Sequence, residues 1–209
     1  MSNTPDYLKN VETTDFTDFK RRVWEMTDKE YYDFYDETFR RLGFFDYTAT
    51  NIQFFRQWIH GTVLDAGCNG GGFLQALRDE GYPKRLVGVD ISKVALDEAA
   101  NRGLEVYWGD LEDRLFFPDR YFNTVVCGHT LEHLRKPMKA FNELKRVSRD
   151  SIIILIPLQG EEARWKKTNT HIQFWPTVEC FEAWAEMRVA ESMVKRDGTL
   201  AIMLFKAGV

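Results

Sequence analysis

Three aspartates that close short apolar runs are the residues best placed to bind a ligand. Asp65, Asp90 and Asp110 each follow a run of apolar residues, and amphipathic segments separate these runs along the chain. That alternation is typical of a parallel β-sheet covered by helices on both faces, and such sheets bind ligands at the carboxyl ends of their strands. We therefore expect the three carboxylates to lie at one edge of a sheet.

A glycine-rich turn directly follows the first of these aspartates, in TVLDAGCNGGGF at residues 62–73. Glycines such as Gly67 and Gly71 allow a ligand to approach the backbone closely, and the helix that follows points its free N–H groups at the turn. A dinucleotide fingerprint, G-x-G-x-x-G, would need glycine where Asn69 stands. The carboxylate of Asp65 would also repel a pyrophosphate, so it favours a ligand with an ammonium or sulfonium group.

The second and third aspartates complete the description of this ligand. Asp90 lies 19 residues beyond Gly71, where an acid binds a ribose diol in related nucleotide sites. Asp110 can accept a hydrogen bond from an adenine amino group. The three acids together predict a nucleoside with a positively charged tail and no pyrophosphate.

The composition limits the class of protein. A chain of 209 residues with 44% hydrophobic residues has the size of one α/β domain, and a net charge of −4 argues against general nucleic-acid binding. Cys68, Cys127 and Cys180 are odd in number and lack metal-ligand spacing, so we predict no metal site and a reduced, cytoplasmic protein. No apolar stretch approaches the roughly 20 residues that span a bilayer. These features do not determine the oligomeric state.

Two helices precede the glycine turn. TDKE at residues 27–30 is a capping box, followed by aromatic residues at helical spacing and closed by Gly43. A second helix is expected over about residues 48–59. We assign residues 1–60 to a helical extension that can act as a substrate lid, and residues 61–209 to the ligand-binding domain. The aromatic face of the first helix, which consists of Tyr31, Phe34, Tyr35 and Phe39, either packs as core or roofs the ligand pocket.

The C-terminal end departs from the alternating pattern. Strands are expected at residues 121–127 and 151–156, then a helix around 177–187, and finally strands at 189–195 and 200–206 joined by a two-residue Asp197-Gly198 turn. The predicted fold is therefore a Rossmann-like, mostly parallel sheet of seven strands that ends in an antiparallel hairpin, with helices on both faces.

From about residue 51 onward the chain resembles the class I S-adenosylmethionine-dependent methyltransferases of small-molecule type, similar to methyltransferase domain 11. LDAGCNGG at residues 64–71 resembles the first motif of that family, with Asn69 in place of its second glycine. VGVDIS at 87–92 resembles the ribose-binding segment, GDL at 109–111 the adenine-binding segment, and FNTVVCGHTLEHL at 122–134 the fourth-strand motif.

The resemblance implies S-adenosyl-L-methionine as cofactor, with S-adenosyl-L-homocysteine as product. It also implies a set of cofactor-binding residues that surrounds the carboxyl ends of the first four strands. These are Asp65, Gly67, Cys68, Asn69, Gly71, Asp90, Ile91, Gly109, Asp110, Leu111 and His129.

Methyl transfer needs few dedicated catalytic groups, because aligning the acceptor in a dry pocket supplies most of the acceleration. A general base matters when the acceptor is protonated, and the candidates are His129, after the fourth strand, and His171, in the long connection 158–176. Each histidine has an alternative role as hydrogen-bonded scaffold, and His133 is expected to be a packed helix-start residue. The charged segment 160–175 suits a flap over the substrate.

Three functions remain open from the sequence. The first is methyl transfer to an oxygen or nitrogen of a small-molecule acceptor. The second is methylation of RNA or protein, which would need a basic or grooved face that the acidic composition does not indicate. The third is a cofactor-binding module that regulates a partner without chemistry.

Overall fold

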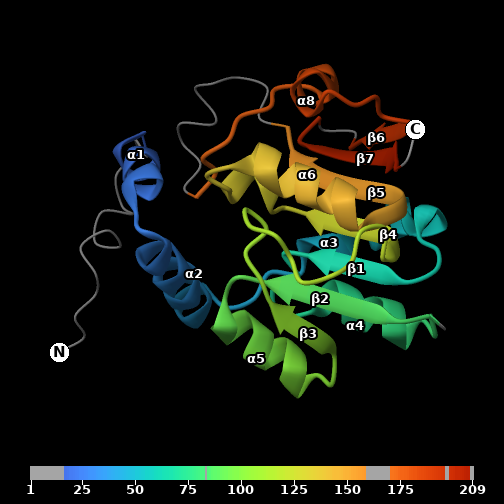
Figure 1. Cartoon of the computed structure of the whole chain (residues 1–209), viewed down its shortest axis with the longest axis horizontal. Coiled ribbons are helices and arrows are strands. Elements are labelled where there is room, and N and C mark those ends of the chain that lie inside the picture. The colour runs from blue at the N-terminus through green and yellow to red at the C-terminus, as the bar shows by residue number, and fades with distance from the viewer. Residues whose placement is uncertain (1–16, 83, 159–169, 196–197, 208–209) are drawn as a thin grey trace.

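A seven-stranded sheet forms the centre of the computed structural model, which describes residues 17–82, 84–158, 170–195 and 198–207 (Figure 1). The strand order is β3-β2-β1-β4-β5-β7-β6. β1 to β5 run parallel, and β7 is antiparallel to both β5 and β6. The strands are β1 (Val63–Ala66), β2 (Leu86–Asp90), β3 (Glu105–Trp108), β4 (Phe122–Gly128), β5 (Ser148–Pro157), β6 (Glu191–Val194) and β7 (Leu200–Lys206).

Helices pack on both faces of this sheet, as the sequence predicts. They are α1 (Thr17–Glu25), α2 (Asp28–Leu42), α3 (Tyr47–Asn51), α4 (Gly72–Asp79), α5 (Lys93–Asn101), α6 (Pro137–Val147) and α8 (Val178–Ala185), with 3₁₀ helices η2 (Ile52–Phe54), η3 (Arg56–Trp58) and η4 (Leu131–His133). Among the described residues no helix has both the length and the apolar character that crossing a membrane requires.

Strand side chains alternate between two hydrophobic clusters, one on each face of the sheet. In β5, Ile152 and Ile154 pack with α6 and α8, while Ile153 and Leu155 pack with α4 and α3. All of these side chains are buried, which explains why the strand is a nearly continuous apolar run. A third, smaller cluster joins α1 and α2 to Ile172 at the end of the sheet.

The capping box predicted at the start of α2 is confirmed. The backbone N–H of Glu30 donates to the Thr27 hydroxyl, and the backbone N–H of Thr27 donates to the Glu30 carboxylate at 2.8 Å. Gly43 ends the helix with φ of +77°. These local interactions set both ends of α2, the helix that lies over the carboxyl ends of the strands (Figure 1).

The prediction of a single helix over residues 48–59 is wrong, because this stretch divides into α3, η2 and η3. Side chains early in the segment hydrogen-bond backbone carbonyls four residues earlier, Thr50 to Asp46 and Asn51 to Tyr47. Such bonds compete with regular helix geometry. Phe55 then leaves the helical region of backbone conformation, with φ of −129°. Its ring is buried in the hydrophobic cluster that α4 forms with one face of the sheet. Burial of the aromatic side chains overrides the helical periodicity here.

The terminal hairpin forms as predicted, but its turn is longer than two residues. The Lys195 N–H donates to the Leu200 carbonyl, so residues 196–199 separate the last bonded pair. Gly198 has φ of +70°, a conformation that favours glycine, while Asp197 lies outside the described residues. The pairing of β7 with β5 runs from Ser151–Lys206 to Pro157–Leu200.

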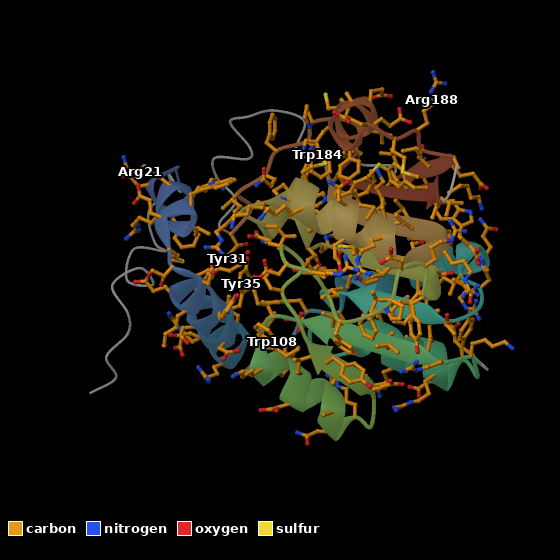
Figure 2. All side chains as sticks on the ribbon, viewed as in Figure 1. Arg21, Tyr31, Tyr35, Trp108, Trp184 and Arg188 are labelled. Atoms are coloured by element: carbon orange, nitrogen blue, oxygen red, sulfur yellow. The ribbon has the colours of Figure 1, made fainter. Side chains whose placement is uncertain are left out.

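Replacing Phe141 with alanine should test the packing of α6 on the sheet. Its ring is fully buried against Phe205 and against Phe181 and Trp184 of α8 (Trp184 is labelled in Figure 2). We expect Phe141→Ala to lower the free energy of unfolding by about 3–5 kcal/mol in a chemical denaturation curve. Phe116, which is 64% exposed, is the control, and Phe116→Ala should cost less than about 1 kcal/mol. Similar losses in the two variants would contradict this packing.

Candidate functional site

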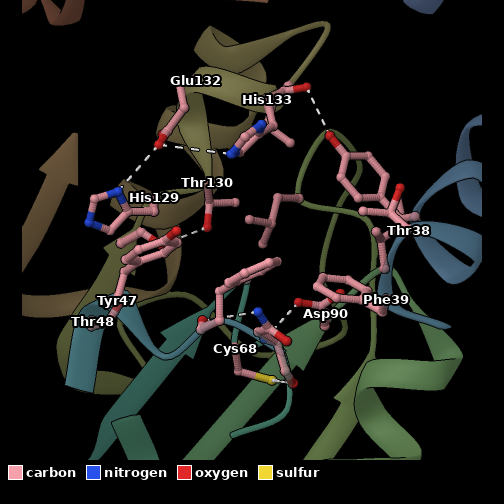
Figure 3. Close-up of a pocket in the computed structure, with 18 of the residues that line it drawn as sticks. Thr38, Phe39, Tyr47, Thr48, Cys68, Asp90, His129, Thr130, Glu132 and His133 are labelled. Atoms are coloured by element: carbon pink, nitrogen blue, oxygen red, sulfur yellow. Dashed lines mark hydrogen bonds and ion pairs between the residues drawn. The ribbon is translucent and has the colours of Figure 1, made fainter. Parts of the chain in front are cut away.

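A pocket of about 440 Å³ opens at the carboxyl ends of β1 to β4, and side chains of α2, among them Thr38 and Phe39, line one side of it (Figure 3). The strand order reverses direction between β1 and β4, and ligands of doubly wound sheets bind outside such a switch point. The volume lies within the range of about 300–1,000 Å³ that is usual for small-molecule sites. The pocket is therefore where the sequence predicts a ligand.

The structure brings nearly all of the predicted site residues to this one pocket. Its lining includes Asp65, Gly67, Cys68, Asn69, Asp90, Ile91, Gly109, Asp110, Leu111, His129 and His171. Gly71 is the exception. It is the left-handed N-cap of α4, and a Cβ at this position would collide with the side chain of Leu104, so its role is to allow close packing of the turn.

The glycine turn depends on left-handed backbone at two positions that line the pocket. Gly67 has φ of +82°, and a Cβ there would meet the Thr130 side chain. Asn69 has φ of +51°, so the asparagine in place of the family's second glycine keeps the left-handed conformation. Its backbone N–H donates to the Asp90 carboxylate at 2.8 Å, which ties the turn to the end of β2.

Asp65 is a buried carboxylate at the floor of the pocket. Burial raises its pKa well above the ordinary range, and the nearby Asp90 and Asp46 raise it further. Within the described part of the chain its side chain makes no hydrogen bond or ion pair, although it lines the cavity. A ligand ammonium would relieve this desolvated, crowded negative charge.

Asp90 and Asp110 are held by backbone N–H groups, so their side chains have fixed directions. Asp90 accepts from Ser92 at 2.9 Å and from Asn69, and Asp110 accepts from the Glu112 N–H at 2.8 Å. Burial raises the pKa of both carboxyls despite these bonds. Both acids therefore face the pocket as oriented acceptors.

Tyr32 on α2 is a contact that the sequence analysis missed. Its hydroxyl donates to Asp110 Oδ2 at 3.1 Å, and its ring packs edge-on against Trp108 with centroids 5.5 Å apart. The Trp108 indole N–H in turn donates to the Ile91 carbonyl at 2.8 Å. Helix α2 thus contacts the predicted adenine end of the pocket. The only sign of this contact in the sequence is the number of tyrosines in the helix.

The aromatic face of α2 serves both of the roles that the sequence left open. Phe34 packs in the small core cluster with α1, whereas Tyr35 and Phe39 line the pocket, and Tyr31 belongs to both sets. The hydroxyls of Tyr31 and Tyr35 both donate to the His133 carbonyl, at 3.1 and 3.4 Å. This face closes the pocket and positions the segment that follows β4.

His129, Glu132 and His133 gather at the end of the pocket opposite Cys68 of the glycine turn (Figure 3), and His171 also lines the pocket. Glu132 Oε1 lies 3.6 Å from His129 Nδ1 and 3.9 Å from His133 Nε2. The prediction that His133 is a packed helix-start residue is wrong, because His133 is the last residue of η4 and is half-buried at the pocket, where the centroid of its ring lies 4.9 Å from that of His171. Glu132 and His133 belong to the L-E-H sequence that directly follows β4, so the sequence already placed these two side chains next to each other.

The electrostatics of this group follow from burial and mutual proximity. Burial and the neighbouring His133 lower the pKa of His171 to about 4, so its imidazole is neutral at pH 7. Burial opposes ionisation of Glu132, but His129, His133 and His171 outweigh it and lower the pKa of the carboxyl. His129 has φ of +54°, a strained backbone conformation of the kind that concentrates at functional sites.

Comparison with known families assigns the central part of the chain. Residues 64–156 match a family model described as a methyltransferase domain. This segment is a class I S-adenosylmethionine-dependent methyltransferase domain. The matched range extends from β1 into β5 and contains the glycine turn, the three aspartates and the L-E-H segment, so the methyltransferase domain includes most of the pocket floor.

Two curated relatives are similar to part of this chain. The bifunctional methionine biosynthesis protein MetXA/MetW of Rhodopirellula baltica is 37% identical over 100 residues, which are 44% of this chain and 16% of that protein. The probable methyltransferase ltbC of Aspergillus luteorubrus is 32% identical over 100 residues, 41% of this chain and 35% of that protein. The match thus covers only about a third or less of each relative's length.

A solved structure from Thermotoga maritima has the same fold. It is described as an S-adenosylmethionine-dependent methyltransferase and possible histamine N-methyltransferase, and it superposes with a TM-score of 0.63 at 17% identity. The similarity covers 88% of this chain and 99% of that one. At this low identity the match establishes the shared fold alone.

Removing the charge of Asp65 should weaken cofactor binding. We expect Asp65→Asn to reduce the affinity for S-adenosylmethionine about 10–100-fold in titration calorimetry, because a charge-assisted hydrogen bond contributes about 1.5–3 kcal/mol. Asp79→Asn, at the exposed end of α4, is the matched control and should bind as the wild type does. Unchanged binding by Asp65→Asn would rule out an ionic contact at this floor position.

The raised pKa of Asp65 also predicts a pH dependence. In the free protein this carboxyl is protonated up to a higher pH than an ordinary aspartate, and a cationic ligand pairs only with the ionised form. Affinity for S-adenosylmethionine should therefore rise with pH through the acidic range and become constant once Asp65 ionises in the free protein. Calorimetry across pH 5 to 7 measures this, and the slope should be smaller in Asp65→Asn.

Proposed function

We propose that the protein transfers a methyl group from S-adenosylmethionine to an oxygen or nitrogen of a small-molecule acceptor. The observation that carries the proposal is that one enclosed pocket joins three strand-end aspartates at its floor to an aromatic wall and a histidine-rich end. The aspartates suit a cationic nucleoside, and the other end suits a compact organic acceptor.

The described residues fit this cofactor. S-adenosylmethionine supplies a methyl group attached to a sulfonium, which an acceptor can displace. In this proposal Asp65 holds the amino group, Asp90 accepts hydrogen bonds from the ribose hydroxyls, and Asp110 accepts from the adenine amino group. The desolvated carboxylate of Asp65 and the backbone-oriented carboxylates of Asp90 and Asp110 support these assignments.

The aromatic wall favours a small acceptor. Tyr35 and Phe39 cover the pocket from α2, and Phe45 and Tyr47 extend this cover toward His129. Such a wall excludes water and holds an acceptor in a fixed direction, which are the two main contributions that methyl transfer requires of a protein. We assign residues 17–58, which contain this wall, to closure of the acceptor end.

His129 and His171 remain the candidate bases for an acceptor that carries a proton. The pKa of about 4 makes His171 a weak base, so His129 is the better of the two. Its Nδ1 faces Glu132, a buried carboxylate that can orient the ring, as in other base–carboxylate pairs. His129→Ala should then lower kcat for protonated acceptors more than it raises KM.

A methyl-transfer screen tests the proposal directly. Wild-type protein, S-adenosylmethionine and panels of small hydroxyl and amine compounds, RNA and peptides are combined, and S-adenosylhomocysteine is measured. We expect turnover with a small molecule and at least a 100-fold loss of turnover in Asp90→Ala. Turnover only with RNA or peptide would contradict the small-molecule assignment. Tight cofactor binding without turnover on any panel would instead favour a regulatory module.

A further inference from the structure

Glu132, His133 and His171 bring three potential metal ligands together at the acceptor end of the pocket. One ligand atom from each residue lies within 4.8 Å of the other two. Tetrahedral ligands on a metal at about 2.0–2.1 Å lie about 3.4 Å apart, so small side-chain rotations would bring all three into coordination. Two imidazoles and one carboxylate on one side of a metal leave positions open for a substrate.

Glu132 is a buried carboxylate that accepts no hydrogen bond from the described residues. The residue is only 1% exposed, and neither of its carboxylate oxygens has a hydrogen-bond partner among the described residues. The nearest imidazole nitrogens, at 3.6 and 3.9 Å, are beyond hydrogen-bond distance. Burying a carboxylate without hydrogen bonds is unfavourable, and a bound cation would offset that cost.

The orientation of His133 fits a metal ligand. Its Nδ1 lies 3.0 Å from the Thr170 carbonyl, which can only accept a hydrogen bond, so Nδ1 carries the proton. In the neutral ring Nε2 then has a free lone pair, and this is the atom that faces Glu132. Metal-binding histidines commonly donate their other N–H to a backbone carbonyl in this way.

Backbone hydrogen bonds hold His171 against the other two ligands. The N–H groups of Ile172 and Gln173 both donate to the Glu132 carbonyl, at 2.8 and 3.0 Å. The Gln173 side chain donates to Leu134, and the buried Lys20 ammonium donates to the His171 carbonyl at 2.6 Å. These bonds fix the segment after residue 169 to η4, so the ligand atoms are preorganised rather than accidental neighbours.

We propose that Glu132, His133 and His171 bind a divalent transition-metal ion of the Zn²⁺ type, whose open positions face the pocket and bind an acceptor oxygen. The metal site stands on this geometry alone, whereas its contact with an acceptor rests on the proposed methyltransferase function. Its acceptor class would be compounds with a hydroxyl oxygen that coordinates the metal, and that hydroxyl would release its proton to bulk water on binding.

Metal titration of the full chain tests the site without depending on activity. Metal-free protein is titrated with Zn²⁺ by calorimetry and with Co²⁺ by visible absorption, which reports the ligand geometry. We expect one equivalent of each to bind, and Mg²⁺, which prefers oxygen ligands, to bind much more weakly. Failure of both Zn²⁺ and Co²⁺ to bind the wild type would overturn the proposal.

Two matched variants separate this site from surface binding. We expect Glu132→Gln and His171→Ala to weaken Zn²⁺ binding at least 100-fold and to remove the Co²⁺ absorption. His60→Ala should bind as the wild type does, because His60 is half-exposed and lies outside the pocket, paired with Asp150 at 3.3 Å. Equal losses in His60→Ala, or no loss in Glu132→Gln and His171→Ala, would overturn the assignment.

Cofactor binding distinguishes failure of this proposal from failure of the proposed function. S-adenosylmethionine should bind the metal-free protein and both ligand variants, since Asp65, Asp90 and Asp110 belong to the opposite end of the pocket. Retained cofactor binding also shows that the variants are folded. With a hydroxyl acceptor found in the screen, removal of the metal should lower turnover at least 10-fold and Zn²⁺ should restore it. Full turnover without metal would reject the acceptor contact while leaving methyl transfer intact.

Discussion

The burial of carboxylates at one edge of the sheet is the constraint on which the rest of the site depends. Asp65 and Asp90 are both removed from water, which raises the pKa of each carboxyl, and nearby acids raise it further: Asp90 and Asp46 at Asp65, and Asp36 at Asp90. Asp90 is tolerated because the backbone of the glycine turn donates to it, and Asn69 must adopt a left-handed conformation to do so. Asp65 has no such donor in the described structure, so its charge is best compensated by a cationic ligand. The turn, the strand ends and the choice of cofactor therefore form one electrostatic arrangement.

Helix α2 converts this open sheet edge into an enclosed pocket. Its capping box and Gly43 set its length locally, and its aromatic face then makes three different contacts: Phe34 with α1, Tyr32 with Asp110, and Tyr31 with the carbonyl of His133. Phe19 and Phe34 pack with centroids 5.7 Å apart. One helix thus links the Asp110 end of the pocket to the histidine-rich end, and changes in its position would affect both together.

Local sequence predicted those features that depend on neighbouring residues. The capping box, the strand runs of β2 and β5 and the antiparallel pairing of β6 with β7 follow from backbone preferences and from side-chain alternation within a few residues. The prediction of one helix over 48–59 is wrong because the burial of Phe55 determines the backbone there more strongly than the helical spacing of apolar residues does. The predicted two-residue turn is too short, because the last hydrogen-bonded pair of the hairpin is Lys195 and Leu200.

The sequence by itself determined the fold class, the three strand-end aspartates and the type of methyl donor, because these rest on short motifs and on the period of apolar residues. Only the tertiary structure decided how the histidine-rich end of the pocket is built. Glu132 and His171 are 39 residues apart in the chain, and Tyr31 and His133 are 102 apart. Their meeting depends on how α2 and the segment after residue 169 pack on the sheet. Such contacts arise from the packing of whole elements, which no local pattern specifies.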